Sequence, residues 1–180
     1  MRKRWRRVIA AGASLWLATL VLYEATPGPF PSPVEGVPGR SIGPSFHAPR
    51  AEIGRHQGVD IFAQRGTKVR SVGWGIVLGI STQRMGGKVV HVLGEQGVLA
   101  FYAHLDDWAP GLHSGQIVEK GDVIGFVGDT GNAKGTPPHL HFELRPVATL
   151  FAPVDPLLFL HGSDPRERAE AAALSLPERR

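Results

Sequence analysis

The 180-residue sequence contains no cysteine. This absence excludes a disulfide framework, a thiol nucleophile and a cysteine-ligated zinc finger, so histidine and carboxylate side chains must supply any metal site. Charged residues make up only 20% of the chain and hydrophobic residues 42%, which excludes a disordered polyelectrolyte. The length is that of one ordinary domain with tails.

Several catalytic motifs are also missing. The sequence has no helical His-Glu-x-x-His motif, no Gly-x-Ser-x-Gly and no phosphate-binding loop, which argues against zincins, serine hydrolases and nucleotide-binding proteins. Glycine and proline, by contrast, are abundant, with 23 and 15 residues. This composition disfavours a helical bundle and favours short strands joined by turns.

The folded part of the chain lacks an excess of positive charge, although the net charge is +4. Five basic residues lie within the first seven positions, and setting them aside leaves 15 basic against 16 acidic residues. A phosphate-binding surface needs clustered cations on the folded domain. We therefore expect no nucleic-acid partner.

An uncharged apolar segment, residues 8–23, follows the basic cluster, as in a signal peptide or signal anchor. As a helix it would span roughly 24 Å, a little short of the ~30 Å hydrocarbon core. Small residues at the −3 and −1 positions of a cleavage site are hard to find, because Tyr23 lies two positions before Ala25. We expect an uncleaved membrane helix, with a cleaved signal peptide as the alternative, and a domain outside the cytoplasm, in the periplasm or cell envelope.

The expected organisation is a signal-anchor or signal peptide over 1–25, a proline-rich linker over 26–44, a folded domain over 45–162 and a C-terminal tail over 163–180. Within the domain, short runs rich in valine and isoleucine are bounded by glycines, which is typical of strands. The expected strands cover 68–72, 75–80, 88–93, 98–105, 116–118, 123–127 and 139–145. We predict an all-β class, with an antiparallel sheet or sandwich, glycine-rich turns and a groove.

Two histidine motifs lie on these expected strands. Alternate strand residues face the same side about 7 Å apart, so His139 and His141 are expected to share one face, opposite the apolar residues around them. By the same rule, Tyr102 and His104 are expected to share a face near the end of their strand.

A third motif places His56 and Asp60 four residues apart, with a glycine between them. Each motif alone is weak evidence for a metal site, because a histidine near an aspartate is commonly a surface pair. Together, two histidines and one carboxylate form the open ligand set that catalytic zinc favours, with the fourth position left for water.

The chain resembles the lysostaphin-type zinc metalloendopeptidases, which cut peptide bonds in bacterial cell-wall peptidoglycan. The resemblance extends from about residue 45 to 160 and rests on His56-x-x-x-Asp60, Tyr102-x-His104-Leu105 and His139-Leu140-His141-Phe142-Glu143. It implies an antiparallel, duplicated hybrid motif fold and an activity in which a zinc-bound water attacks the peptide bond. The implied substrates are stem or cross-bridge peptides.

The resemblance also implies a role for each motif residue. His56, Asp60 and His141 would bind one Zn²⁺ ion, and His104 and His139 would be the catalytic histidines beside the bound water. The loop 130–138 departs from the family pattern, with two prolines in place of a Gly-Pro step, which affects the expected substrate preference.

Two further residues are candidates for supporting contacts. Glu143 shares the expected face of His139 and His141 and could orient an imidazole, and Tyr102 is the second candidate. The other histidines are interpreted as surface or structural residues; they are His47, His91, His113 and His161.

Two alternatives to catalysis stay open. One is a non-catalytic wall-binding regulator of the same fold, an amidase activator, and the other is a biotinyl or lipoyl-like carrier domain. A carrier would need a modifiable lysine at a hairpin tip and no clustered histidines. Whether a protein partner must activate the enzyme is left open by the sequence.

Overall fold

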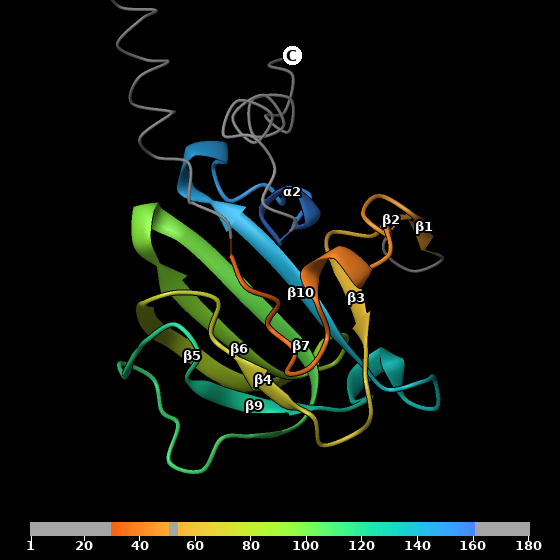
Figure 1. Cartoon of the computed structure of the whole chain (residues 1–180), viewed down its shortest axis with the longest axis horizontal. Helices are drawn as coiled ribbons and strands as arrows, with labels where there is room; N and C mark the ends of the chain where they lie inside the picture. Colours follow the sequence, from red (N-terminus) through yellow and green to blue (C-terminus); the bar gives the residue numbers. More distant parts are fainter. Residues whose placement is uncertain (1–29, 51–53, 161–180) are drawn as a thin grey trace, which may run out of the picture.

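The computed structural model describes residues 30–50 and 54–160. An eight-stranded antiparallel sheet dominates it, with the order β3-β10-β7-β6-β5-β8 and with β9 and β4 branching from β7 (Figure 1). The strands are β3 (Val59–Phe62), β4 (Lys68–Arg70), β5 (Gly75–Gln83), β6 (Gly87–Gly94), β7 (Val98–Trp108), β8 (Ile117–Val118), β9 (Val123–Val127) and β10 (His139–Pro146). The predicted antiparallel all-β class is confirmed, and β4 to β10 all fall on expected strands.

The smaller elements lie around this sheet. A two-stranded hairpin, β1 (Pro49–Arg50) and β2 (Gly54–Arg55), lies beside β3 (Figure 1). The helical turns are η1 (Gly39–Ser41), η2 (Glu95–Gly97), η3 (Gly131–Ala133), η4 (Val147–Thr149) and α2 (Leu157–Leu160). The strand β3 was not among the expected strands, although its sequence contains the aspartate of the first motif.

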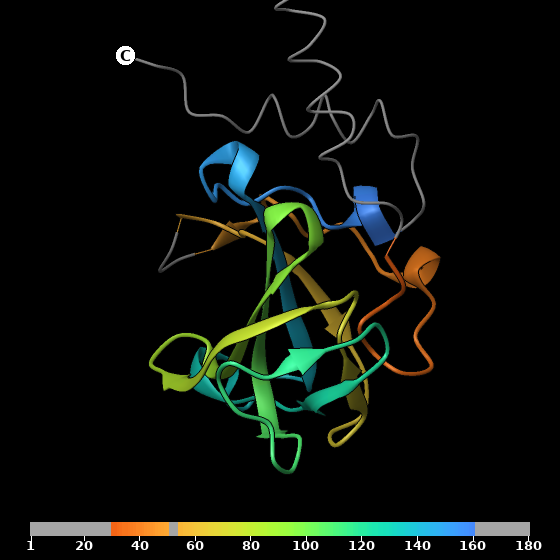
Figure 2. The same ribbon diagram turned by 90° about the vertical axis from the view of Figure 1, so that its left-hand side faces the viewer.

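The longest strand, β7, joins two parts of the fold. From Val98 to Ala103 it pairs with β10, and it pairs with β6 over much of the same stretch. From Leu105 to Trp108 it pairs with β9, which in turn pairs with β4. Figure 2 shows the same ribbon turned by 90°. The register with both β6 and β9 shifts near the change of partner, and His104, at that point, has a left-handed backbone with φ 61°.

The strand β10 separates the core from the opposite face of the sheet. Leu140, Phe142 and Leu144 are fully buried in the hydrophobic core. His139 and His141 alternate with them and both line a cavity on the other face. The predicted division of this strand into a histidine face and an apolar face is confirmed.

The segment 30–44 packs on the domain, whereas the proline-rich linker over 26–44 was expected to be an extended spacer, because its prolines disfavour a helix or a central strand. Val34 is 1% exposed and bridges to Val69, and Ile42 is 5% exposed. The Phe30 ring stacks on Phe159 at 6.1 Å between centroids. The spacer interpretation is therefore wrong for this part, because its apolar side chains fill gaps in the core.

Across residues 30–50 and 54–160, no helix is long and apolar enough to cross a membrane. The expected anchor over 1–25 and the expected tail over 163–180 lie outside the described residues.

Candidate metal centre and groove

Two of the three motifs meet where β3 pairs with β10. In this register Asp60 lies directly opposite His141, and His56 follows the short strand β2. The Asp60 Oδ1 atom is 3.1 Å from His56 Nε2 and 3.1 Å from His141 Nδ1, and these two nitrogens are 2.8 Å apart. All three candidate ligand atoms therefore face one point in space.

The glycine between His56 and Asp60 is required by this packing. A Cβ atom on Gly58 would lie 2.3 Å from the carbonyl oxygen of Phe142 on β10. A side chain here would push the motif away from β10 and from His141. The spacing of this motif thus reflects a close approach of two backbones.

The outward nitrogens of both imidazoles are hydrogen-bonded. His56 Nδ1–H donates to the carbonyl of Ser45 at 2.7 Å, and His141 Nε2–H donates to Glu143 Oε1 at 2.8 Å. In the neutral imidazoles, the inward nitrogens are then acceptors, like Asp60 Oδ1. Three acceptors that converge without a proton between them repel each other, and a cation relieves this repulsion. The donor set, two imidazoles and a carboxylate, fits Zn²⁺.

The protonation of these groups reflects their proximity. Burial alone would raise the pKa of Asp60, but its contacts with the imidazoles of His141 and His56 hold it well below its usual range. Burial likewise opposes the shift at His141, yet the contacts with Asp60 and Glu143 raise the pKa of its imidazole. In the absence of a metal, a proton on His141 satisfies the two carboxylates. A divalent cation can replace that proton.

A second layer of contacts holds Glu143 itself. Its Oε2 atom accepts a hydrogen bond from Arg145 Nε at 2.6 Å, and Arg145 also donates to Gln57 Oε1 at 2.6 Å. Glu143 is 5% exposed; burial would raise its pKa, but the hydrogen bond with His141 and the charge of Arg145 lower it. The carboxylate therefore stays ionised and fixes which nitrogen of His141 carries the proton.

His104 and His139 lie beside the ligand cluster as a separate pair. Their ring centroids are 5.1 Å apart, and His139 Nε2 is 3.9 Å from Asp60 Oδ1. His104 Nδ1–H donates to the carbonyl of Thr130 at 2.8 Å, and His139 Nδ1–H donates to that of Pro137 at 2.9 Å. Both imidazoles are thus anchored through Nδ1 to backbone oxygens, which leaves Nε2 as an acceptor in the neutral form.

The environment of His104 keeps it neutral. Burial, and then the nearby His141 and His139, lower its pKa to about 4. Its left-handed backbone at the bulge of β7 turns the side chain out of the normal strand alternation. At neutral pH this residue can accept a proton.

These residues line one cavity of about 580 Å³. Its walls include polar side chains of the loop 130–138, Asn132 and Thr136, together with Arg50 and Gln57. His91, interpreted as a sheet residue, also reaches this cavity and lies 4.8 Å from the ring of Phe101. The loop 130–138 therefore borders the groove through Asn132, Ala133 and Thr136, while its two prolines are not among the lining residues.

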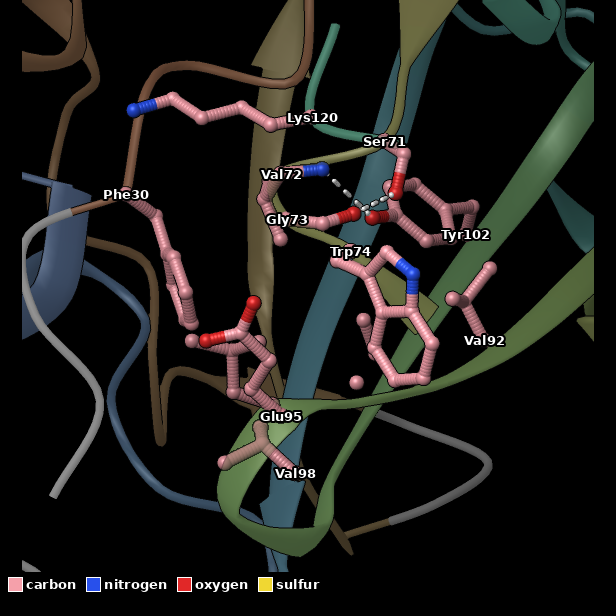
Figure 3. A pocket seen from close by; sticks show the side chains of 13 residues that line it. Phe30, Ser71, Val72, Gly73, Trp74, Val92, Glu95, Val98, Tyr102 and Lys120 are labelled. Carbon is pink, nitrogen blue, oxygen red and sulfur yellow. Dashed lines mark hydrogen bonds between the residues drawn. The ribbon is translucent and has the colours of Figure 1, made fainter. Parts of the chain in front are cut away.

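Tyr102 does not lie in this groove. Its ring is fully buried, 5.1 Å from Phe142, and its hydroxyl accepts a hydrogen bond from the Val72 amide at 3.2 Å. It lines a smaller cavity, of about 200 Å³, between Phe30 and Trp74 on the core side of the sheet (Figure 3). The expectation that Tyr102 and His104 share a face is wrong, because the bulge at His104 breaks the alternation.

The two arginines of the site were missed in the sequence. Arg145 could have been found, because it lies two positions after Glu143 and so shares its face of β10. Arg50 bonds to Asp60 from a hairpin ten residues earlier, and no sequence pattern links the two.

The comparisons with known proteins agree with this geometry. The model of a family described as Peptidase family M23 matches residues 54–156. An L-Ala-D-Glu endopeptidase of Bacillus subtilis is 41% identical over 94 residues, 49% of this chain and 29% of the relative. Lysostaphin of Staphylococcus simulans is 34% identical over 92 residues, 50% of this chain and 18% of the relative. The chain thus spans less than a third of the length of these two relatives.

Solved structures give the same picture. The catalytic domain of lysostaphin from Staphylococcus simulans superposes with a TM-score of 0.58 at 27% identity, covering 68% of this chain and 95% of that one. A zinc containing peptidase from Vibrio cholerae superposes with a TM-score of 0.54 at 31% identity, covering 64% of this chain and 36% of that one.

Proposed function

Since the chain belongs to peptidase family M23, we propose that it is a zinc-dependent endopeptidase that hydrolyses peptide bonds in bacterial cell-wall peptidoglycan. The observation that carries the proposal is the division of one cavity into three convergent acceptors and two separately anchored histidines. Names of the relatives, among them a peptidoglycan DD-endopeptidase of Vibrio cholerae and a glycyl-glycine endopeptidase of Staphylococcus capitis, support a peptide substrate from the wall.

In this proposal, His56, Asp60 and His141 hold one zinc ion. A bound zinc ion supplies Lewis acidity, which polarises a peptide carbonyl and makes a water acidic enough to react near neutral pH. Glu143 holds His141 in the tautomer that offers Nδ1 to the cation. The carbonyl oxygen of Ser45 accepts from Nδ1–H of His56 and so holds His56 in the tautomer that offers Nε2 to the cation.

His104 and His139 have the roles that need proton movement. Both are buried, and both offer Nε2 as an acceptor in the neutral state. We assign to this pair the orientation and deprotonation of the attacking water, the stabilisation of the oxyanion and the transfer of the proton to the leaving amine. The lowered pKa of His104 means that the residue is neutral at pH 7 and so offers Nε2 to the water or the substrate.

The alternative of a non-catalytic regulator gains no support from the site. A regulator has no need for two histidines anchored next to an intact ligand set. We propose further that the domain works outside the cytoplasm, held at the membrane by the segment 1–25. One relative, from Escherichia coli, is named a lipoprotein and is 34% identical over 63% of this chain.

The test uses the full chain, loaded with zinc and incubated with intact peptidoglycan sacculi. Mass spectrometry identifies the released fragments, and the His104→Ala variant serves as the control. New amino termini from the wild type alone would support an endopeptidase and name its bond. Folded, zinc-loaded protein that releases nothing would contradict catalysis by the isolated chain, and release on addition of a partner would point to an activator.

A further inference from the structure

We infer that Arg50 is a positioning residue that reserves one oxygen of Asp60 for the metal. The inference rests on the proposed function, because it assigns to Arg50 a task in the same zinc site. It concerns how the single carboxylate of the ligand set is oriented, and it places the control of that orientation on the exposed hairpin β1–β2.

The two oxygens of Asp60 have different partners. Oδ1 faces the imidazoles, at 3.1 Å from both His56 Nε2 and His141 Nδ1. Oδ2 accepts a hydrogen bond from the guanidinium of Arg50. The carboxylate is therefore held between the imidazole cluster on one side and a fixed positive charge on the other.

This division has a chemical consequence for a bound cation. A carboxylate can bind a metal through one oxygen or through both, and it can exchange the two by rotating about Cβ–Cγ. A charge-assisted bond from arginine engages Oδ2 and opposes this rotation. Asp60 then contributes one oxygen, and the remaining positions are left for water and substrate.

The hairpin that carries Arg50 is tied directly to a ligand. The backbone amide of His56 donates to the carbonyl oxygen of Ala48 at 2.9 Å, and the backbone amide of His47 donates to the carbonyl oxygen of His56 at 2.8 Å. Arg50 itself pairs with Gly54 across the hairpin. One short hairpin thus bears His56 next to β2 and, through Arg50, sets the orientation of the second ligand.

The burial of the pair favours a role in orientation. The Asp60 side chain is 9% exposed, whereas Arg50 is 42% exposed at the wall of the groove. A buried carboxylate depends on its hydrogen-bond partners for its orientation more than an exposed one does. Arg50 has a rival role: as a cation already bound to Asp60, it could compete with zinc. The two roles predict opposite effects on zinc affinity when Arg50 is replaced.

The experiment measures zinc affinity of the full chain by competition with a chromogenic chelator. The variants are Arg50→Gln and Arg50→Lys, and the matched control is Arg55→Gln on the same hairpin. Arg50→Gln is expected to weaken zinc binding by about 10- to 100-fold, the usual effect of removing a group that orients a metal ligand. Arg50→Lys should lose part of the affinity, since it keeps the charge but not the planar fork. Arg55→Gln should bind like the wild type.

Unchanged or tighter zinc binding by Arg50→Gln would overturn the inference, and tighter binding would identify Arg50 as a competitor. If circular dichroism shows that Arg50→Gln does not fold, the affinity of Arg50→Lys decides: wild-type affinity refutes the positioning role. The cobalt-substituted proteins give a second readout. Without Arg50, Asp60 is expected to bind cobalt through both oxygens, which raises the coordination number and changes the visible spectrum. A wild-type spectrum in the Arg50 variants would therefore also refute the positioning role. A wild type that binds no zinc would refute the proposed function instead.

Discussion

The two halves of the groove use the same residue type for different chemistry. On the ligand side, His56 and His141 point at a carboxylate, and the carboxylates of Asp60 and Glu143 raise the pKa of His141. On the other side, His104 and His139 are anchored to backbone oxygens, and burial lowers the pKa of His104 to about 4. The two carboxylates thus contact the imidazole of His141 directly, whereas burial keeps His104 neutral.

The largest expected effect comes from removing a ligand. In His141→Ala, one of three converging acceptors is lost and two carboxylates lose their partner, so zinc affinity should fall by more than about 100-fold. Activity should fall with it to background. Metal analysis after dialysis, beside a peptide release assay, measures both. Retention of one zinc per chain would remove His141 from the ligand set.

The His104→Ala substitution should impair catalysis without affecting zinc binding. We expect activity to drop by about 10²- to 10⁴-fold, the usual contribution of a positioned acid or base, while zinc content stays at that of the wild type. The same two assays apply, and His139→Ala should behave alike. Loss of zinc in either variant would place that histidine among the ligands and contradict the division.

Glu143→Gln should weaken the ligand side without abolishing it. The amide keeps the shape but not the charge, and it can present its NH₂ to His141, so the tautomer is no longer fixed. We expect a zinc affinity about 10- to 100-fold lower, measured by chelator competition. An affinity equal to that of the wild type would show that His141 is oriented by packing alone.

The smallest effect is on stability in acid. The pKa of His104 is lower in the folded state, about 4, than the ordinary value of 6.5. As pH falls below 6.5 the unfolded chain therefore takes up a proton that the folded chain refuses, and stability declines until about pH 4. The loss for this residue is at most about 3 kcal/mol.

Urea unfolding of the metal-free protein between pH 7 and 4 tests this effect. His104→Gln should lose less stability over this range than the wild type, because the glutamine does not titrate. His113→Gln, at an exposed turn, is the control. An acid dependence of His104→Gln that matches the wild type would show that His104 is not held neutral.

Much of the ligand side could be predicted from the sequence, because it follows from regular strands. Alternation placed His139, His141 and Glu143 on one face, whereas the pairing that brings Asp60 opposite His141 involves β3, which was not an expected strand; Asp60 was joined to His141 only through the family resemblance. The roles assigned to these residues stay predictions until the metal is measured.

The irregular parts could not be predicted, for a physical reason in each case. A bulge and a left-handed backbone at His104 separate it from Tyr102, and strand alternation does not foresee a bulge. Arg50 reaches Asp60 through tertiary packing of a hairpin, which leaves no periodic signal. The segment 30–44 looks like a spacer by composition, yet Val34 and Ile42 complete the core.

X-ray absorption at the zinc edge of the zinc-loaded full chain tests most directly the division of the four histidines into two metal ligands and two residues beside the metal. Multiple scattering from imidazole rings counts the histidine ligands. The account predicts two imidazole nitrogens, from His56 and His141, with the remaining ligands being oxygens. Three or four imidazoles at the zinc would contradict it, because His104 or His139 would then be a metal ligand and not part of the separate pair beside the metal.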